Sequence, residues 1–136
     1  MNVDPVNPQE LGPTPGYANG MLGREGGRVL FVAGQIGLVP GQAGAPDVLL
    51  PAQFGEALRR IAVVIEAAGG KPSDVGRMTA YVTDIALYRR CRKAIGPVWR
   101  AHFGTHYPAM ALVEVKALLD EGALVEIEAT AVIGGR

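Results

Sequence analysis

Two segments near the C-terminus, residues 107–115 and 124–132, alternate between apolar and polar side chains. Successive side chains of a strand point to opposite faces, so this alternation predicts two β-strands, which we expect to pair. In the second strand one face is apolar and the reverse face carries Glu126, Glu128 and Thr130. In the first strand the face opposite the small apolar residues carries Met110, Leu112, Glu114 and Lys116.

These strands leave two interpretations of the carboxylates open. If the acidic face lines a cleft, a Glu flanked by Met110 and Leu112 would have its pKa raised, which suits an acid or base in an apolar surround. The alternative is a solvated sheet face with an ion pair between Glu114 and Lys116. The pattern alone favours this second interpretation, because half-buried antiparallel strands alternate in the same way without any function.

Two amphipathic helices are predicted between the strands. In residues 51–68 the apolar positions Phe54, Leu58, Ile61 and Ile65 repeat at helical spacing, with Pro51 suited to the first turn. A second helix follows the N-cap signal at residues 83–84 and ends at Gly104. Pro97 lies inside it and removes one helical hydrogen bond, which predicts a kink or a break there.

Further strands are predicted at residues 28–33 and 75–83, and the first of these is followed directly by Gly34. A glycine in that place predicts a bulge or a close backbone approach that could offer N–H groups to a ligand; a simple hairpin bend is the alternative. Residues 36–39 are expected to continue the strand. Four prolines within the first sixteen residues predict an extended N-terminal arm.

The order of elements, strands, helix, strand, helix and strands, predicts an α+β domain with both helices on one face of a mixed sheet. A length of 136 residues suits one domain. Hydrophobic residues make up 49% of the chain and charged residues 19%, so burial beyond one small core is expected. No remaining element can cover the second sheet face, and we therefore expect an oligomer.

Composition narrows the partners and the location. Thirteen basic and thirteen acidic residues cancel, so the net charge gives no general electrostatic attraction for nucleic acid or for an anionic membrane. The densest basic cluster, residues 89–93, is interpreted as the solvated face of a helix. A single cysteine, the lack of an apolar leader and the lack of a membrane-length apolar run make a cytoplasmic protein the expectation.

Most catalytic constellations lack support in the sequence. His102 and His106 form an isolated pair that favours helix-end packing over a metal site, and Cys91 lies on the apolar side of a helix. The single serine, Ser73, lies in a turn, and no glycine-rich phosphate loop is present. Carboxylates, tyrosines and backbone groups remain, which can move protons and orient water.

Six short motifs occur in register along the chain: residues 33–36, 65–69, 81–84, 107–109, 113–115 and 125–129. Together they resemble the RidA/YjgF reactive intermediate deaminase family, also labelled endoribonuclease L-PSP or translation inhibitor. The resemblance implies a Pro-rich arm at residues 1–16 and a single domain at residues 17–136. That domain would have a chorismate-mutase-like α+β fold, with a mixed six-stranded sheet and two helices, assembled as a homotrimer with clefts at the subunit interfaces.

The same resemblance implies hydrolysis of a small enamine or imine substrate to a carbonyl compound and ammonia, with no metal and no organic cofactor. Glu126 falls at the position of the acidic residue that activates the attacking water. Met110 stands where active members carry an Arg that clamps the substrate carboxylate, and Leu112 stands where a Cys is frequent. The implied substrate-binding positions are Tyr17, Ala33, Gly34, Met110, Ala111 and Leu112.

Methionine cannot reproduce a charge-assisted Arg–carboxylate contact, whose loss weakens binding by about one to two powers of ten. We therefore expect a substrate other than 2-aminoacrylate, or a substitute cation, for which Arg24, Arg28 and His106 are candidates by position. A non-catalytic trimer that binds a small metabolite is the alternative. An endoribonuclease is a remote alternative, because such an activity requires a basic groove with stacking aromatic residues.

Overall fold

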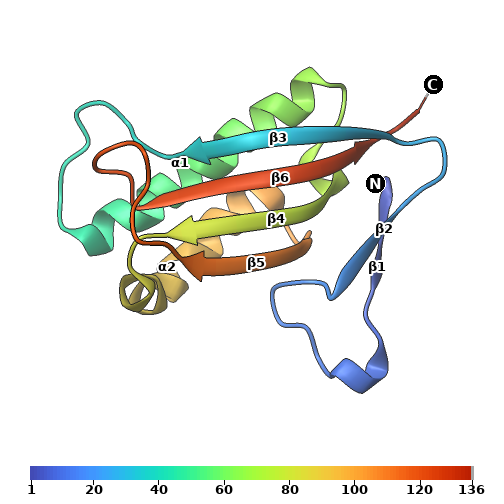
Figure 1. Cartoon of the computed structure of the whole chain (residues 1–136), viewed down its shortest axis with the longest axis horizontal. Coiled ribbons are helices and arrows are strands. Elements are labelled where there is room, and N and C mark those ends of the chain that lie inside the picture. Colours follow the sequence, from blue (N-terminus) through green and yellow to red (C-terminus); the bar gives the residue numbers. More distant parts are fainter. Residues whose placement is uncertain (136) are drawn as a thin grey trace.

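A four-stranded sheet forms the centre of the molecule, with two helices on one face and a separate two-stranded sheet beside one end (Figure 1). This computed structural model describes residues 1–135. The elements in chain order are β1 (Val3–Val6), η1 (Gln9–Leu11), β2 (Gly20–Gly23), β3 (Arg28–Ile36), α1 (Pro46–Ala67), η2 (Pro72–Asp74), β4 (Val75–Val82), α2 (Ile85–Phe103), β5 (Ala109–Glu114) and β6 (Val125–Ile133). Neither helix is long and apolar enough to cross a membrane, among the residues described.

The main sheet has the order β3-β6-β4-β5. Strand β6 runs antiparallel to both of its neighbours, whereas β5 runs parallel to β4, to which it is connected through α2. The predicted mixed sheet with its helices on one face is confirmed, and its six strands divide into four and two. The predicted pairing of the two Glu-bearing strands is wrong, because β4 lies between them.

The core fills the space between the sheet and the two helices. Strand side chains that point to this side are fully buried, and so are the stripes of both helices. Its largest members with under 2% exposure include Phe54, Leu58, Ile61, Ile65, Met78, Val82, Val125 and Ile127. Each such side chain contributes about 1.5–3 kcal/mol through removal from water, so this stripe decides which face each helix presents.

Helix α1 begins at Pro46, earlier than the predicted start at Pro51, and Pro51 lies inside it. A proline inside a helix leaves the carbonyl four residues earlier without its usual N–H partner. Here that carbonyl belongs to Asp47, and the Cys91 thiol donates to it at 3.6 Å. Burial raises the pKa of Cys91, which keeps the thiol protonated and able to donate.

Helix α2 starts as predicted, with the Asp84 carboxylate accepting from the Leu87 backbone N–H at 3.0 Å. It ends at the predicted Gly104, whose φ of 59° suits glycine. The predicted break at Pro97 is wrong, since one helix runs from Ile85 to Phe103. Burial of its apolar side on both sides of Pro97 outweighs the loss of a single hydrogen bond.

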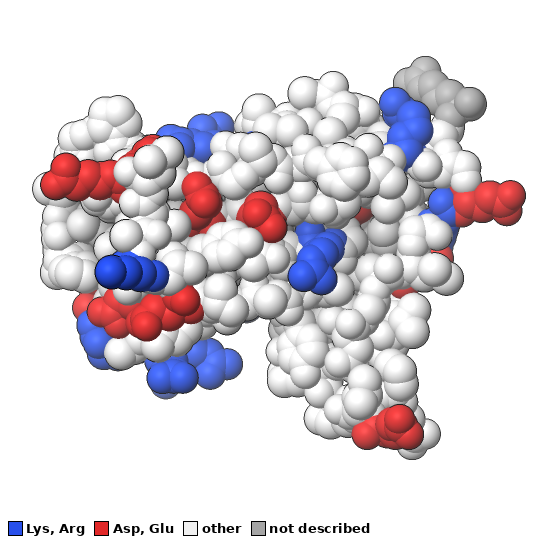
Figure 2. Space-filling model, viewed as in Figure 1, with Lys and Arg blue, Asp and Glu red and all other residues white. Residues whose placement is uncertain are grey.

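No helix covers the other face of the main sheet, and we call this the open face. Figure 2 shows it as mostly uncharged, with acidic groups near the middle of the sheet and a basic group beside them. Three large apolar side chains lie exposed on it: Phe31 at 80%, Val29 at 58% and Val113 at 43%. Such exposure on one face is typical of a surface that associates with another chain.

The N-terminal segment is fixed to the main domain by one buried carboxylate. Asp74 is 2% exposed and accepts hydrogen bonds from the Asn2 backbone N–H at 3.1 Å, the Asn2 side-chain amide at 2.9 Å and the Lys71 backbone N–H at 3.0 Å. Further along, the Ala18 N–H donates to the Pro108 carbonyl at 3.1 Å. The division at residue 16 into arm and domain stays a prediction.

Replacement of Asp74 by Ala should lower the free energy of unfolding by about 2–4 kcal/mol, because it leaves buried N–H groups without an acceptor. Urea denaturation followed by circular dichroism measures this difference. Ser73→Ala is the control, since the Ser73 side chain makes none of these hydrogen bonds and should change stability little. Equal losses for the two variants would contradict the role assigned to Asp74.

Candidate active site in two halves

Glu126 lies on the open face near the start of β6, and a buried glutamine positions that start. Gln53 of α1 is 2% exposed; its side-chain oxygen accepts from the Leu124 N–H at 2.8 Å, and its amide donates to the Gly122 carbonyl at 3.0 Å. These two bonds fix the loop that leads into β6. Helix α1 therefore sets where the Glu126 side chain leaves the strand.

The predicted bulge after Val32 is confirmed. Val32 pairs with Ala129 and Gln35 pairs with Ile127, so two residues of β3 face one residue of β6. A Cβ placed on Gly34 would lie 2.9 Å from the carboxyl carbon of Glu126. The predicted close approach at Gly34 is therefore real, and the group that approaches is the Glu126 carboxylate.

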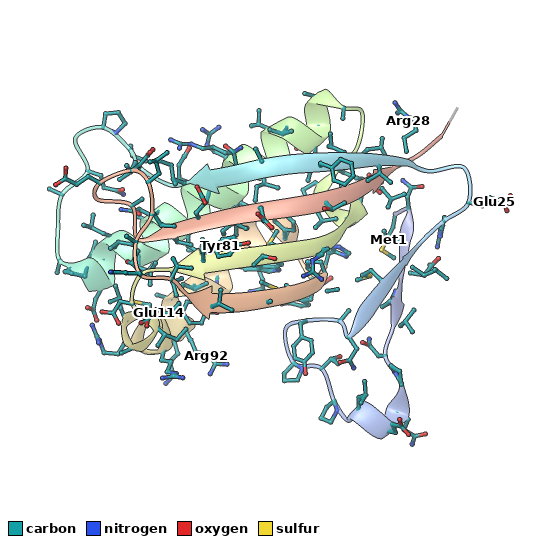
Figure 3. All side chains as sticks on the ribbon, viewed as in Figure 1. Met1, Glu25, Arg28, Tyr81, Arg92 and Glu114 are labelled. Carbon is teal, nitrogen blue, oxygen red and sulfur yellow. The ribbon has the colours of Figure 1, made fainter. Side chains whose placement is uncertain are left out.

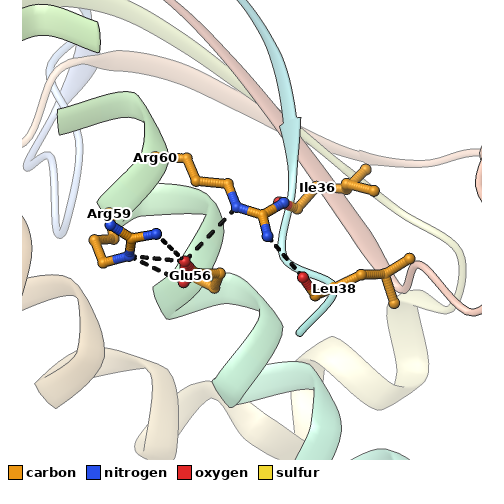
Figure 4. A network of polar contacts seen from close by, with 5 residues as sticks. All are labelled: Ile36, Leu38, Glu56, Arg59 and Arg60. Carbon is orange, nitrogen blue, oxygen red and sulfur yellow. Dashed lines mark hydrogen bonds and ion pairs between the residues drawn. The ribbon is translucent and has the colours of Figure 1, made fainter. Parts of the chain in front are cut away.

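The end of β3 is tied to α1 by Arg60 (Figure 4). Its guanidinium donates to the Ile36 and Leu38 carbonyls, at 2.7 Å each, and an ion pair of 3.6 Å to Glu56 holds it in place. Hydrogen bonds from Arg59 hold the pKa of Glu56 below its usual value, so this carboxylate stays charged.

Strand β3 ends at Ile36, so the predicted continuation to residue 39 is wrong. The physical cause is the next residue. A Cβ on Gly37 would lie 1.7 Å from the Gln53 carbonyl oxygen, which shows how closely the chain passes α1 there. The chain leaves the sheet at this contact. The bulge that bears Gly34 is thus held from both sides, by the β6 ladder and by α1.

Tyr81 stands directly opposite Glu126 in the β4–β6 ladder, and Figure 3 shows it near the C-terminal end of β4. Partial burial and the negative charges of Glu128 and Glu126 raise the pKa of Tyr81, so its phenol is neutral at pH 7. We call Ala33, Gly34, Tyr81 and Glu126 the open-face group. Its carboxylate can accept a proton, and the Tyr81 phenol hydrogen-bonds to Glu128 on the same face.

Met110 and Leu112 do not lie beside Glu126. They stand opposite Met78 and Ala80 in the β4–β5 ladder and pack against the core on the helix side. Within one copy of the chain, therefore, no Glu of β6 is flanked by both residues. The alternation in β5 was identified correctly, but nothing in one strand's pattern tells which of its faces matches a given face of another strand.

Glu114 does not belong to the predicted row of acidic residues either. Its carboxylate accepts from the Ile85 N–H at 3.0 Å and so caps the first turn of α2. Among the ion pairs of residues 1–135 there is none between Glu114 and Lys116, so that part of the solvated-face interpretation is wrong. Ala111, by contrast, lies on the open face, opposite Thr79.

Met110 lines a cavity of about 240 Å³ between β5 and α2, which we call the edge cavity. Trp99 forms one wall. Its indole N–H donates to the His106 carbonyl at 3.1 Å, and its ring stacks on Tyr107 with centroids 5.8 Å apart. The lining residues are Gly16, Phe54, Tyr88, Arg92, Ile95, Gly96, Trp99, Tyr107 and Met110.

Tyr17 lies on the same side of the molecule as the edge cavity. The neighbouring Ala18 forms an isolated parallel bridge with Ala109 at the start of β5, and Gly16 lines the edge cavity itself. Tyr17 borders a larger hollow of about 640 Å³ that shares Tyr107 with the edge cavity. The predicted site residues therefore fall into two sets, with Tyr17 and Met110 in one and Gly34 and Glu126 in the other.

One copy of the chain does not bring these two sets together, because the sheet separates them. A site that uses both Met110 and Glu126 requires a second copy, whose open-face group would face the edge cavity of the first. Sequence reasoning missed Tyr81, Arg92 and Trp99 as candidate site residues. The register of Tyr81 against Glu126 and the closure of the edge cavity by α2 are tertiary features without a local sequence signal.

Comparison with known proteins decides the family. The family model described as Endoribonuclease L-PSP matches residues 8–133. The chain belongs to the endoribonuclease L-PSP family. The family includes the RidA/YjgF proteins, so the resemblance drawn from the six motifs is confirmed.

Relatives within this family match along nearly the whole chain. A RutC family protein of Pyrococcus horikoshii is 32% identical over 124 residues, which cover 91% of this chain and 90% of the relative. A 2-iminobutanoate/2-iminopropanoate deaminase of Salmonella typhimurium is 31% identical over 125 residues, with coverage of 92% and 91%.

Solved structures agree with the fold. The Rid family protein YyfB of Yersinia pestis, described as a protein of unknown function, has a TM-score of 0.76 at 29% identity and covers 98% of this chain and 100% of its own. The YjgF protein of E. coli has a TM-score of 0.64 at 29% identity, with coverage of 93% and 92%. The α+β fold with two helices and a mixed sheet is that of the YjgF/Rid structures.

Proposed function

We propose that this protein hydrolyses a reactive imine or enamine to a carbonyl compound and ammonia, in a cleft formed between two copies of the chain. The observation that carries the proposal is the Glu126 carboxylate seated over the Gly34 backbone on the open face, with the Tyr81 phenol opposite. A family relative named as a 2-iminobutanoate/2-iminopropanoate deaminase supports the reaction class.

In the proposed reaction Glu126 accepts a proton from water as the water oxygen bonds to the imine carbon. The electron pair of the C=N double bond moves to nitrogen, which takes up the proton held by Glu126 and gives a carbinolamine. Glu126 then accepts the hydroxyl proton and passes it to nitrogen as the C–N bond breaks, which releases ammonia and leaves the carbonyl. Positioned proton transfer of this kind contributes about 10²–10⁴ in rate.

A homotrimer is the proposed assembly, with the open faces buried between copies. The exposed apolar residues Val29, Phe31 and Val113 support it, since their burial would contribute to association. In a closed ring with head-to-tail contacts, the edge cavity of each copy can face the open-face group of the next. Each cleft then contains Met110 from one copy and Glu126 from its neighbour.

Met110 limits which imines the proposed cleft can bind. If it occupies the carboxylate-clamping position, Met110→Arg should raise kcat/KM for 2-aminoacrylate by about ten- to hundredfold, through a charge-assisted contact. Release of the keto acid from 2-aminoacrylate measures this gain. A neutral imine without a carboxylate is the control substrate, and its rate should not rise. An equal gain on both substrates would refute a carboxylate clamp at this position.

The alternatives make different predictions for the same cleft. A purely binding protein would hold imines, or their carbonyl products, without turnover of any member of an imine panel. We do not propose ribonuclease activity, because the chain has no net positive charge to attract the phosphates of RNA.

A further inference from the structure

The edge cavity has the chemistry of a site for a flat apolar group. Apart from Arg92, its lining consists of aromatic rings, Met110, Ile95 and two glycines. Its volume of about 240 Å³ exceeds that of a cavity of about 150 Å³ known to hold benzene. An aromatic ring or a branched aliphatic group therefore fits, whereas a two-carbon side chain would leave most of the cavity empty.

The walls of the edge cavity are fixed before any ligand arrives. The planes of Trp99 and Tyr107 differ by 12°, and the indole N–H is held by a backbone carbonyl. On the opposite wall Phe54 and Tyr88 pack with ring centroids 6.3 Å apart. A preformed aromatic wall binds planar groups with little loss of conformational entropy.

Arg92 is the charged residue of this lining, and it is exposed at the cavity mouth. Figure 3 shows it projecting from α2 beyond the β5 edge. The nearby Arg90 is bound to Asp47 at 3.2 Å, but Arg92 is in none of the ion pairs formed by residues 1–135. Its positive charge reaches Tyr88, where it opposes the increase in pKa that burial causes.

We propose that Arg92 binds the carboxylate of an aromatic or branched aliphatic substrate whose apolar body fills the edge cavity beside Met110. This inference names the substrate class of the proposed function and rests on it. Arg92 supplies the positive charge from α2 at the cavity mouth, and Met110 lines the same cavity from β5. The substrate acid must then be longer or bulkier than 2-aminoacrylate, so that its carboxylate reaches the mouth while its apolar body lies inside.

The single tryptophan, Trp99, gives a direct readout of this cavity. We would titrate the protein with 3-phenylpropionate and with its neutral analogue 3-phenylpropanamide, following Trp99 emission on excitation at a wavelength that phenyl groups do not absorb. The expected result is binding of the acid about tenfold tighter than the amide, as for a charge-assisted contact at an exposed site.

Arg92→Gln should abolish the preference for the acid while the amide binds as before, which shows that the cavity is intact. Arg89→Gln is the matched control, because it removes the same charge one turn earlier on α2 from a residue outside the cavity lining. This variant should keep the preference. Arg92→Lys should keep part of it, since a lysine retains the charge but loses the planar fork.

Three results would overturn the inference. These are equal binding of acid and amide to the wild type, equal loss of preference in Arg92→Gln and Arg89→Gln, and loss of amide binding in Arg92→Gln. The probes contain no imine, so the experiment does not depend on turnover. Acid-selective binding in a protein that hydrolyses no imine would support the Arg92 site and refute the proposed function alone.

Discussion

Replacement of Glu126 by Gln should lower kcat for the best imine substrate by about 10²- to 10⁴-fold, the usual contribution of a positioned general base. Glutamine has nearly the shape of glutamate, so it can rest over Gly34 in the same way, but its amide cannot accept a proton from water at neutral pH. The loss should fall on kcat, with KM little changed.

Glu128→Gln is the matched control for this experiment. Glu128 lies on the same strand and the same face, opposite Thr79 and the bulge, but the carboxylate that a Cβ on Gly34 would meet is that of Glu126. Steady-state release of the carbonyl product should show near wild-type rates for this variant. Circular dichroism of both proteins verifies that they are folded. Equal rates for Glu126→Gln and the wild type would remove Glu126 from the mechanism.

The local pattern of the chain predicted the buried face of β4 and β6, but it did not identify the buried face of β5, where Met110 and Leu112 pack on the core, and it could not order the strands. In β6 the apolar set around Val125 and Ile127 is buried as expected. The error came from joining β5 to β6, which are neighbours in sequence. The crossover through α2 makes β5 a parallel partner of β4, and that choice depends on packing between α2 and the sheet.

Prolines misled the helix predictions for a related reason. Pro51 and Pro97 each remove one backbone donor, which favours a helix start or break when only local structure is considered. In the fold, burial of the helix stripes outweighs this loss, and the Cys91 thiol binds the carbonyl released by Pro51. Compensation by a residue 44 positions away cannot be seen in a sequence window.

The candidate site was predictable where one residue carries its own signal. Gly34 after a β-branched strand indicated a close backbone approach, and Glu126 followed from the family resemblance. Tyr81 and Arg92 needed the register of two strands and the position of α2, which only the folded chain provides. The sheet separates Met110 from Glu126 within one copy, so the proposed cleft takes these two residues from different copies of the protein.

A shared cleft predicts that two inactive variants restore one another. Glu126→Gln removes the base, and Met110→Trp fills the edge cavity with an indole while it leaves the open-face group intact. Each variant alone should be inactive. In mixed head-to-tail assemblies formed at equal ratio, some clefts combine the intact edge cavity of one copy with the intact Glu126 of the next. Random mixing makes these clefts about a quarter of the total.

The measurement is the rate of imine hydrolysis after the two variants are unfolded and refolded together, compared with each variant refolded alone. A cleft shared between copies predicts recovery of about a quarter of the wild-type rate, set by the fraction of intact clefts in a symmetric ring. Separately refolded samples, mixed afterwards without exchange of subunits, should stay inactive. A jointly refolded sample that also stays inactive, although its size matches that of the wild-type oligomer, would contradict a catalytic site divided between two copies of the chain.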